Sequence, residues 1–324
     1  MNICFLDSSP VPYDHTYIDS NKIRGAERAL INLVLELDKL GHKITVLNHT
    51  NSKTIYRNIR WLNIDNYYDS ECFDLAITNN DINNFNIIKS KKKIAISHSI
   101  QSIEKFIRKK QLISFIKHKP KIFLLSNYHR QNRSFFLRMF GSDIINWSVD
   151  EIFIKTELLK EVDANKAIFT SFKDRNLDLL ISIWINYIYP NNNNLKLYVT
   201  PNDVDNTKHN VFHRNFGSQK ELIADLSSAK VFLIPGHKAE LYCIAAEEAR
   251  ELCIPTVTFG IGSLSERVDH NKTGFIANSK KEFANYTLEL FTNIDAWNEI
   301  RQNLISLRNS NNWKFTTKKI LKKI

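Results

Sequence analysis

The sequence predicts an α/β protein made of two doubly wound domains. Its 324 residues are about twice the usual size of a single domain, and 43% of them are hydrophobic, which is enough to bury two cores. Short apolar runs with strand character alternate with segments of helical periodicity along most of the chain. This alternation is typical of parallel βαβ units, so two parallel sheets are expected.

The first half begins with a strand, which the clearest helix of the chain follows. Ala26, Leu30 and Leu37 belong to a series of apolar residues that repeats at helical spacing up to residue 40, and Gly41 ends it. The helix leads directly into the next strand. The expected strands of this half are 3–6, 44–47, 75–77, 93–96 and 122–125.

A second alternating series begins near residue 167. Its expected strands are 167–170, 195–199, 231–234 and 255–259, and its expected helices are 174–187, 218–227 and 242–252. The predicted domains are 1–150 and 151–305, followed by a basic tail or helix at 306–324. Ligands of doubly wound domains bind beyond the carboxyl ends of the strands, so the cleft between the two halves is the expected site.

Cysteine content and the lengths of the apolar runs indicate the compartment. The four cysteines are too few and too scattered for a disulfide framework or a zinc site, which predicts a reducing environment. No secretory signal is expected, because the N-terminus lacks a basic region and Asp7 interrupts its apolar run. The longest apolar stretch, 177–189, is too short for a membrane span. A cytoplasmic protein is therefore predicted.

The net charge of +11 is concentrated in residues 89–138. That stretch holds fourteen Lys or Arg and one acidic residue, Glu104, so its local charge is +13 and the rest of the chain sums to −2. Such a region binds an anionic membrane surface or nucleic acid, or it is a solvated face enlarged by compositional bias. Residues 104–117 lack a single apolar stripe, which favours superficial attachment over deep insertion. The residues expected to face an anionic surface are Lys105, Arg108, Lys109, Lys110 and Lys117.

The segment 236–276 is the best candidate for a functional site. Glu240 and Glu248 are separated by seven residues, and Glu248 lies on an expected helix whose apolar face includes Ile244 and Ala245. If Glu240 precedes this helix in a loop, both carboxylates point into one cleft. The N-terminus of the helix would favour a phosphate group there.

This segment resembles the retaining GT-B glycosyltransferases of family 4, also called glycosyl transferases group 1. The donor domain of that family carries Glu-x7-Glu followed by Ala and a short turn into a strand. Here the matching residues are Glu240, Glu248, Ala249, Pro255, Gly262 to Glu266 and Lys272 to Phe275. Cys253 stands where the family usually has Gly, and Tyr242-Cys243 replaces its Phe-Gly.

Other segments resemble the same family in the same order. Residues 24–28 are similar to its Gly-Gly-Ala-Glu-Arg loop and place Gly25 and Ala26 near the donor diphosphate, while His98 resembles its strand-end histidine. In TSFKDRNLDLL, Arg175 matches the position of the family's phosphate-binding Lys. Lys173 is the candidate replacement for the family's Arg. The resemblance covers nearly the whole chain.

The resemblance implies a GT-B fold, in which two Rossmann-like domains face each other across a cleft, with the acceptor side at 1–150 and the donor side at 151–305. It implies transfer of a sugar from a nucleotide diphosphate sugar to a glycan or glycolipid, as in cell-envelope or surface polysaccharide synthesis. Glu240 would bind sugar hydroxyls, His98 would orient the sugar and Glu248 would bind the ribose. Gly25, Ala26, Lys173 and Arg175 would hold the diphosphate. The expected enzyme needs no metal and no cofactor, and it is cytoplasmic or peripheral on the inner face of the cytoplasmic membrane.

Two other functions stay open at this point. A basic α/β protein that binds nucleic acid would fit the charge, and a GT-B nucleotide-sugar epimerase would fit the fold. The Glu-x7-Glu segment favours sugar transfer over both, and no nucleic acid is expected as partner. Asp203 and Asp205 are expected to form a turn rather than a metal site. His209 and His213 are expected on a strand that would not bring their rings together, so no metal ligand is predicted.

Overall fold

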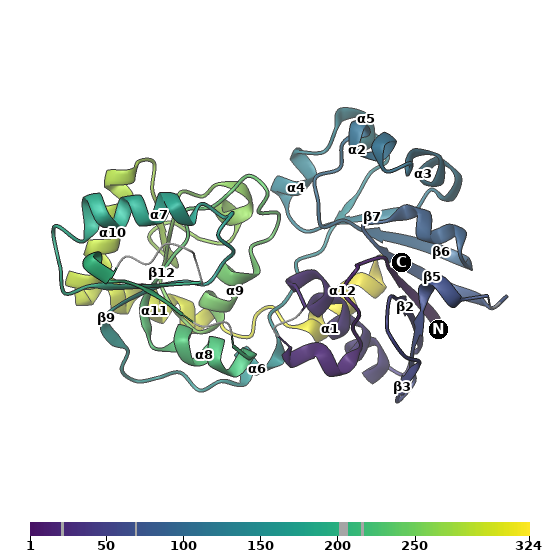
Figure 1. Cartoon of the computed structure of the whole chain (residues 1–324), viewed down its shortest axis with the longest axis horizontal. Helices are drawn as coiled ribbons and strands as arrows, with labels where there is room; N and C mark the ends of the chain where they lie inside the picture. The colour runs from purple at the N-terminus through teal and green to yellow at the C-terminus, as the bar shows by residue number, and fades with distance from the viewer. Residues whose placement is uncertain (21–22, 69, 201–206, 215–216) are drawn as a thin grey trace. The chain divides into compact units, whose positions relative to one another are not determined.

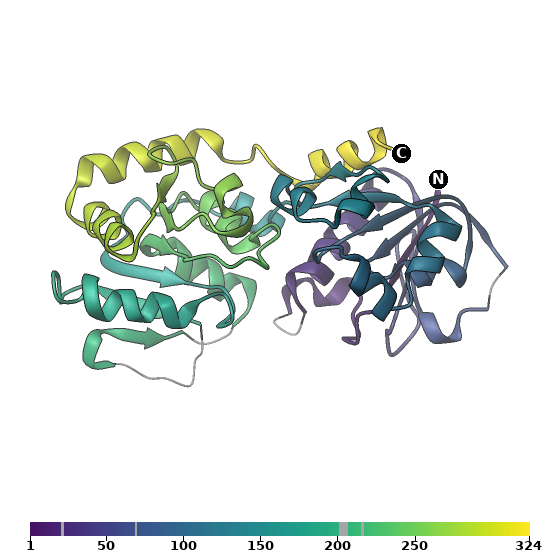
Figure 2. The same ribbon diagram turned by 90° about the horizontal axis from the view of Figure 1, so that it is seen from above.

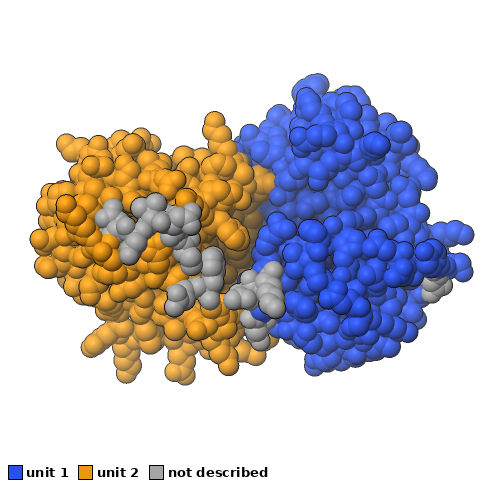
Figure 3. Space-filling view, viewed as in Figure 1, with its two compact units in different colours: residues 1–147, 313–324 blue, residues 148–312 orange. Residues whose placement is uncertain are grey.

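A computed structural model describes residues 1–20, 23–68, 70–200, 207–214 and 217–324. The chain divides into two compact units (Figure 3). Unit 1 comprises residues 1–147 and 313–324, and unit 2 comprises residues 148–312. The boundaries at 150 and 305, which separate an acceptor side from a donor side, stay predictions about function.

Unit 1 contains an eight-stranded sheet in the order β3-β4-β2-β1-β5-β6-β7-β8 (Figure 1). All neighbouring strands are parallel except β3, which runs antiparallel to β4. The strands are β1 (Asn2–Asp7), β2 (Lys43–Asn48), β3 (Thr54–Tyr56), β4 (Ile59–Asn63), β5 (Cys72–Asn79), β6 (Lys89–Ile96), β7 (Lys121–Leu124) and β8 (Asp143–Ile144). The central strands are almost completely buried, as expected for a parallel sheet covered on both faces.

The described residues of unit 1 form six α-helices. They are α1 (Gly25–Lys39), α2 (Ile103–Arg108), α3 (Leu112–His118), α4 (Asn127–Gln131), α5 (Phe135–Arg138) and α12 (Trp313–Lys322), with shorter 3₁₀ turns at His15–Asp19, Ile64–Asn66 and Ile82–Asn86. The first helix begins at a capping box, in which the Glu27 carboxylate accepts from the backbone N–H of Arg24 at 3.2 Å. The helices α2, α3 and α5 gather at one end of the unit (Figure 1).

The last helix of the described chain, α12, packs on unit 1 against α1 (Figure 2). The ring of Trp313 lies 5.3 Å from that of Trp147, and the Thr316 hydroxyl donates to the carbonyl of Asn146 at 3.1 Å. The ammonium of Lys323 pairs with Asp143 on β8. The basic C-terminal segment is therefore part of the first core.

Unit 2 contains a parallel six-stranded sheet in the order β11-β10-β9-β12-β13-β14. Its strands are β9 (Asp163–Phe169), β10 (Lys196–Val199), β11 (Val211–His213), β12 (Ala229–Leu233), β13 (Thr256–Thr258) and β14 (Gly274–Ile276). Its helices are α6 (Glu151–Lys155), α7 (Leu177–Ile183), α8 (Gln219–Ser227), α9 (Ile244–Glu251), α10 (Lys280–Thr292) and α11 (Ile294–Leu307). A π-helical turn, Trp184–Ile188, extends α7, and 3₁₀ turns lie at Thr207–His209 and Gly262–Glu266.

The predicted strands and the long helices are confirmed, with boundary shifts of a few residues. One strand, β6, begins at Lys89 rather than Lys93, because its first residues pair with Cys72 and Phe73 of β5. The sequence analysis missed β3, β4, β8 and β14 and the helices α2 to α6, α10 and α11, whereas α12 lies within the basic tail or helix expected at 306–324. Among the described residues, every helix is too short or too polar to cross a bilayer.

His129 is a completely buried histidine of α4 that unit 1 holds in its neutral form. The backbone N–H of Leu125 points to its Nδ1 at 3.4 Å, and its Nε2 lies 3.0 Å from the carbonyl oxygen of Ser99. Only the tautomer with the proton on Nε2 satisfies both contacts. Burial, with a smaller effect of Arg133, lowers the pKa of His129 to about 4.

We expect acid to destabilise unit 1 through His129. The unfolded chain takes up this proton near pH 6.5 and the folded chain only near pH 4, so stability is full above pH 6.5 and falls between these values, by about 3 kcal/mol at most. Urea unfolding between pH 7 and pH 4 should show a shallower pH dependence for His129→Gln than for wild type. His49→Gln, at a half-buried ring beside Asp65, is the control. An unchanged slope in His129→Gln would contradict the assignment.

Candidate functional site

The strand order of unit 2 reverses between β9 and β12. From β9 the chain builds outward through β10 and β11, then returns to place β12 on the other side of β9. The loops that follow β9 and β12 therefore leave neighbouring strands in opposite directions and open a crevice, which is the usual ligand site of a doubly wound sheet. Arg175 lies in the first of these loops and Glu240 in the second.

Arg175 and Glu240 form an ion pair at this crevice. Nε of Arg175 lies 2.5 Å from Oε1 of Glu240, and their side chains are 22% and 11% exposed. A pair this well shielded from water is stronger than a surface ion pair, and each partner orients the other. Two residues that the sequence analysis assigned to the donor site separately are thus in direct contact.

Backbone hydrogen bonds hold the Glu240 loop in place. The N–H of Glu240 donates to the carbonyl of His237 at 2.9 Å, and the carbonyl of Glu240 accepts from the N–H of Ser263 at 2.8 Å. The side-chain amide of Asn176, next to Arg175, donates to the carbonyl of Gly236 at 2.5 Å. The loops after β9 and β12 are therefore tied to each other and to the 3₁₀ turn at Gly262–Glu266.

Gly262 permits the close approach of this turn to the Glu240 loop. Its φ is +76°, and a Cβ atom there would lie 2.6 Å from the carbonyl oxygen of His237 and 2.7 Å from that of Glu240. Both atoms belong to the backbone, which cannot move aside as a flexible side chain can. Only glycine fits without displacing the loop that carries Glu240.

Two cysteines occupy left-handed positions on either side of α9. Cys243 has φ +59° and caps the helix N-terminus, while Cys253 has φ +57° just beyond its C-terminus. These are the positions where the resembled family has glycine. The backbone keeps the glycine-like conformation, and both thiol side chains are buried.

The carboxylates of α9 have different surroundings. Glu247 is buried and pairs with Arg267 at 2.8 Å and with Arg250 at 2.7 Å. Glu251 accepts from the backbone N–H of Asn309 at 2.8 Å. These three contacts stabilise the fold of unit 2. Glu248, the predicted ribose-binding residue, is also buried.

Further polar groups of unit 2 lie near this crevice. Lys173 is exposed in the loop after β9, two positions before Arg175. Thr170 and Ser263 carry buried hydroxyl oxygens that have no hydrogen-bond partner within the described ranges. Buried hydroxyls without a partner in the protein are available to a ligand. Both residues lie in segments that resemble the family, but the sequence analysis gave neither a role.

Unit 1 has its own reversal of strand order, between β1 and β5. A pocket there is lined by Ala26, Asn79 and His98, together with apolar residues of β1, β5 and α1. Gly25 is the first residue of α1, whose N-terminal N–H groups have no partner within the helix. Of the residues predicted on the acceptor side, Ala26 and His98 thus line a single pocket.

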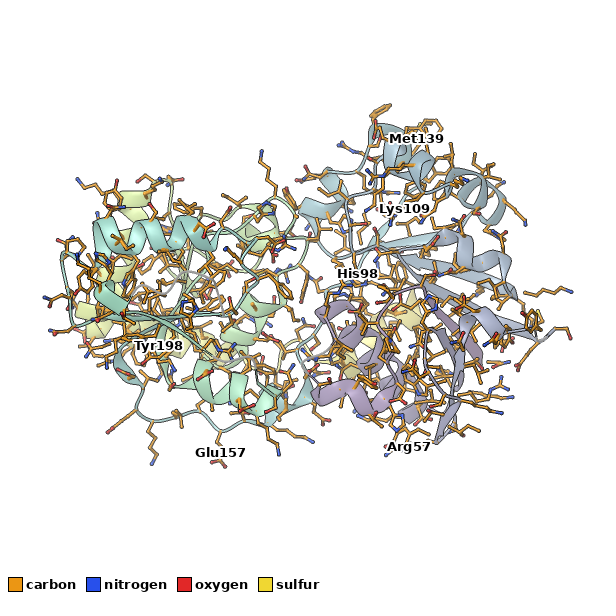
Figure 4. The ribbon with its side chains drawn as sticks, viewed as in Figure 1. Arg57, His98, Lys109, Met139, Glu157 and Tyr198 are labelled. Carbon is orange, nitrogen blue, oxygen red and sulfur yellow. The ribbon has the colours of Figure 1, made fainter. Side chains whose placement is uncertain are left out.

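His98, labelled in Figure 4, is held beside a tryptophan at this pocket. Its backbone N–H donates to the side-chain oxygen of Asn80 at 2.7 Å, and its ring stacks on Trp147 with centroids 5.8 Å apart. Burial, with a smaller effect of His129, lowers its pKa to about 4. The imidazole is neutral at pH 7 and offers one donor and one acceptor.

The sequence analysis missed a buried carboxylate at the same end of the sheet. Asp7, the last residue of β1, accepts from the Tyr13 hydroxyl at 2.5 Å and from the backbone N–H of Ser9 at 3.1 Å. Burial raises its pKa. The only signal in the sequence was its place directly after a buried strand.

The cations predicted to face an anionic surface gather on α2, α3 and the turn between them. Arg108, Lys109, Lys110 and Lys117 are exposed, whereas Lys105 is half-buried. Large apolar side chains are exposed among them. These are Ile107, Ile113, Ile116, Phe135, Phe136, Met139 and Phe140.

The described residues contain no group of three His, Cys, Asp or Glu side chains arranged to hold a metal ion. Asp203 and Asp205 lie outside the described residues. His213 ends β11 and His209 ends the preceding 3₁₀ turn, with its ring 5.3 Å from that of Tyr189.

A comparison with known protein families finds a match that includes the Glu240 loop and α9. Residues 202–306 match the family described as "Glycosyl transferases group 1". No curated protein sequence matches the chain.

Three solved structures are similar to the chain over nearly its whole length. Sucrose-phosphate synthase from Thermosynechococcus elongatus is 12% identical with a TM-score of 0.70, over 99% of this chain and 98% of that one. Anabaena HepE, in complex with UDP and glucose, is 14% identical with a TM-score of 0.70, over 100% and 99%. WaaG, a glycosyltransferase involved in lipopolysaccharide biosynthesis, is 12% identical with a TM-score of 0.65, over 98% of each chain. The predicted GT-B fold is confirmed.

We expect Gly262→Ala to destabilise unit 2 by more than the backbone cost of placing alanine at a positive φ. The control is Gly41→Ala, at φ +80° with no atom within 4 Å of the added Cβ, which should cost about 1 kcal/mol. Gly262→Ala carries the same backbone cost and two backbone collisions in addition. Urea unfolding of both variants measures the difference, and equal losses would show that the loop moves freely.

Proposed function

We propose that this glycosyltransferase uses a nucleotide diphosphate sugar and retains the anomeric configuration. The match of residues 202–306 to the glycosyl transferases group 1 family confirms the predicted enzyme class. The acceptor is a glycan or a glycolipid. The observation that carries the proposal is the Arg175–Glu240 ion pair at the strand-order reversal of unit 2.

Arg175 has the chemistry to bind the leaving diphosphate. Its guanidinium matches phosphate oxygens in a two-pronged geometry, and the donor replaces part of its contact with Glu240. Lys173, exposed in the same loop, adds a second cation. The departing phosphate gains negative charge in the transition state, so cations fixed in advance contribute most to the rate.

Glu240 and Glu248 bind the hydroxyl groups of the donor. Glu240 is fixed by Arg175 and by the turn at Gly262, so its carboxylate accepts hydrogen bonds from sugar hydroxyls without reorganising. Glu248 lies in the second turn of α9 and accepts from the ribose. Neither carboxylate is a metal ligand in this assignment, and we propose that the enzyme works without a metal.

Unit 1 supplies the acceptor side. The N-terminal N–H groups of α1 at Gly25 and Ala26 attract the diphosphate. The neutral ring of His98 hydrogen-bonds to the transferred sugar and adds no positive charge. WaaG acts in lipopolysaccharide biosynthesis, and the exposed cations of α2 and α3 suit an acceptor at an anionic membrane. The proposed location is thus peripheral, on the inner face of the cytoplasmic membrane.

We expect Glu240→Gln and Arg175→Ala to separate two roles. Glu240→Gln should lower sugar transfer at least a hundredfold and leave the affinity for UDP within a fewfold of wild type. Arg175→Ala should weaken UDP binding by about 1.5 to 3 kcal/mol, as for other charge-assisted contacts. Lys280→Ala, an exposed cation of α10, is the control. Calorimetry with UDP and a donor-consumption assay measure both effects.

The outcomes are distinct because melting curves report the fold independently. Unchanged turnover in Glu240→Gln with an intact melting curve would refute the role of this carboxylate. Equal UDP affinity in Arg175→Ala and wild type would place the diphosphate elsewhere.

We also expect the basic helices of unit 1 to bind anionic vesicles. Changing Arg108, Lys109 and Lys110 to Ser should release the protein from vesicles that contain phosphatidylglycerol, since each cation contributes about 1 kcal/mol near such a surface. High salt should have the same effect. The control, in which Lys314, Lys318 and Lys322 of α12 are changed to Ser, removes the same charge elsewhere. Cosedimentation that is indifferent to salt and to the first triple variant would mean a solvated face and a soluble acceptor.

A further inference from the structure

Arg133 is a buried arginine between α4 and α5 that lacks the partners such a group needs. It is 2% exposed. Its Nη1 donates to the carbonyl of Gly141 at 3.0 Å, but its Nε and Nη2 are buried and have no hydrogen-bond partner among the residues that the structure describes. An unsatisfied buried donor is costly, and an unpaired buried cation more so.

The charged surroundings of Arg133 are positive. Burial, with a smaller effect of Arg138, lowers the pKa of Arg133 to about 10. Among the residues that the structure describes, no carboxylate acts on the Arg133 guanidinium. The fold thus concentrates positive charge where an anion is missing.

Arg133 is one of the residues that line a pocket of about 420 Å³. Its lining residues are Arg130, Gln131, Arg133, Arg138, Gly141 and Ser142. Arg138 is fixed by hydrogen bonds to the carbonyls of Arg133 and Gln131, and Arg130 by the side chain of Asn127 at 3.0 Å. Three guanidinium groups, one buried and two exposed at the rim, therefore line one pocket.

We propose that this pocket binds a phosphate group, which supplies the counter-charge for Arg130 and Arg138 at the rim and, after a small shift of the buried guanidinium, the missing hydrogen-bond acceptors of Arg133. The oxygens of a phosphate match the fork of a guanidinium, and a cluster of arginines is a common way to bind one. The pocket lies in unit 1, whereas Arg175 and Glu240 lie in unit 2. The inference does not depend on the proposed sugar transfer.

The phosphate comes from a lipid headgroup or from a soluble molecule. Phe135 and Met139, on and just after α5, are 80% and 72% exposed beside the pocket residues. Met139 extends from the same end of unit 1 as Lys109 (Figure 4). Exposed apolar side chains next to an arginine pocket suit an interface between water and lipid, where the apolar groups enter the headgroup region.

The test measures binding of inorganic phosphate by the full chain, by calorimetry and by the shift of the melting temperature in otherwise phosphate-free buffer. Wild type should be stabilised by phosphate. Arg133→Gln, and separately Arg130→Gln with Arg138→Gln, should bind phosphate at least tenfold more weakly. Lys53→Gln, at an exposed lysine of unit 1, is the control. Arg175→Ala should retain phosphate binding at this pocket, which separates it from the donor site.

A second arm uses phosphatidylcholine vesicles with and without phosphatidylglycerol. Arginine-dependent binding of free phosphate supports a soluble source, and binding to anionic vesicles that is lost in Arg133→Gln but kept in Lys53→Gln supports a lipid source. If Arg133→Gln does not fold, the rim variant with two exposed substitutions decides. The proposal is overturned if neither probe binds, or if both bind equally well to the arginine variants and to wild type.

Discussion

The site of each unit depends on one constraint, the reversal of strand order in a parallel sheet. Where the order reverses, neighbouring strands end side by side while their following loops turn to opposite faces, so the backbone itself leaves room for a ligand. In unit 2 this brings Arg175, after β9, to Glu240, after β12. In unit 1 it brings Asp7, at the end of β1, to the same edge as Asn79, at the end of β5. The sheet topology thus determines where the polar residues of both sites lie, independently of the hydrogen bonds and ion pairs that their side chains form.

Much of this fold could be predicted because buried parallel strands are short apolar runs, and such runs are easily recognised between helices. The edges of the sheets were harder. The strands β3 and β14 have three residues each, and α2 to α5 are one or two turns long, so none carries a periodic pattern that rises above chance. The family resemblance identified Glu240 and Arg175 one by one. Their contact could not be predicted, since it depends on the conformations of the two loops that follow β9 and β12.

The environment of the charged side chains could not be predicted from the sequence either. The sequence concentrates +13 in residues 89–138, but the structure divides these cations between two environments. Lys91 and Lys121 are paired with Asp74 and Asp143 along the strands. The cations of α2 and α3 are exposed instead, next to apolar side chains. Net charge by itself therefore says little about a surface, because partners that lie far away in the chain neutralise some cations and leave others to act together. Arg133 is the extreme case, a cation buried without a counter-charge among the described residues.

The packing of α12 on unit 1 has a consequence for the order in which the protein forms. Unit 2 is continuous in the chain, whereas unit 1 lacks the helix that carries Trp313 until every residue of unit 2 has been synthesised. On a ribosome, the second core can therefore be completed from its own segment while the first still exposes the side of α1 and the Trp147 ring that α12 will cover. The domain that begins first is the one that matures last, and during that interval its uncovered apolar side is a surface for chaperones or for misassembly.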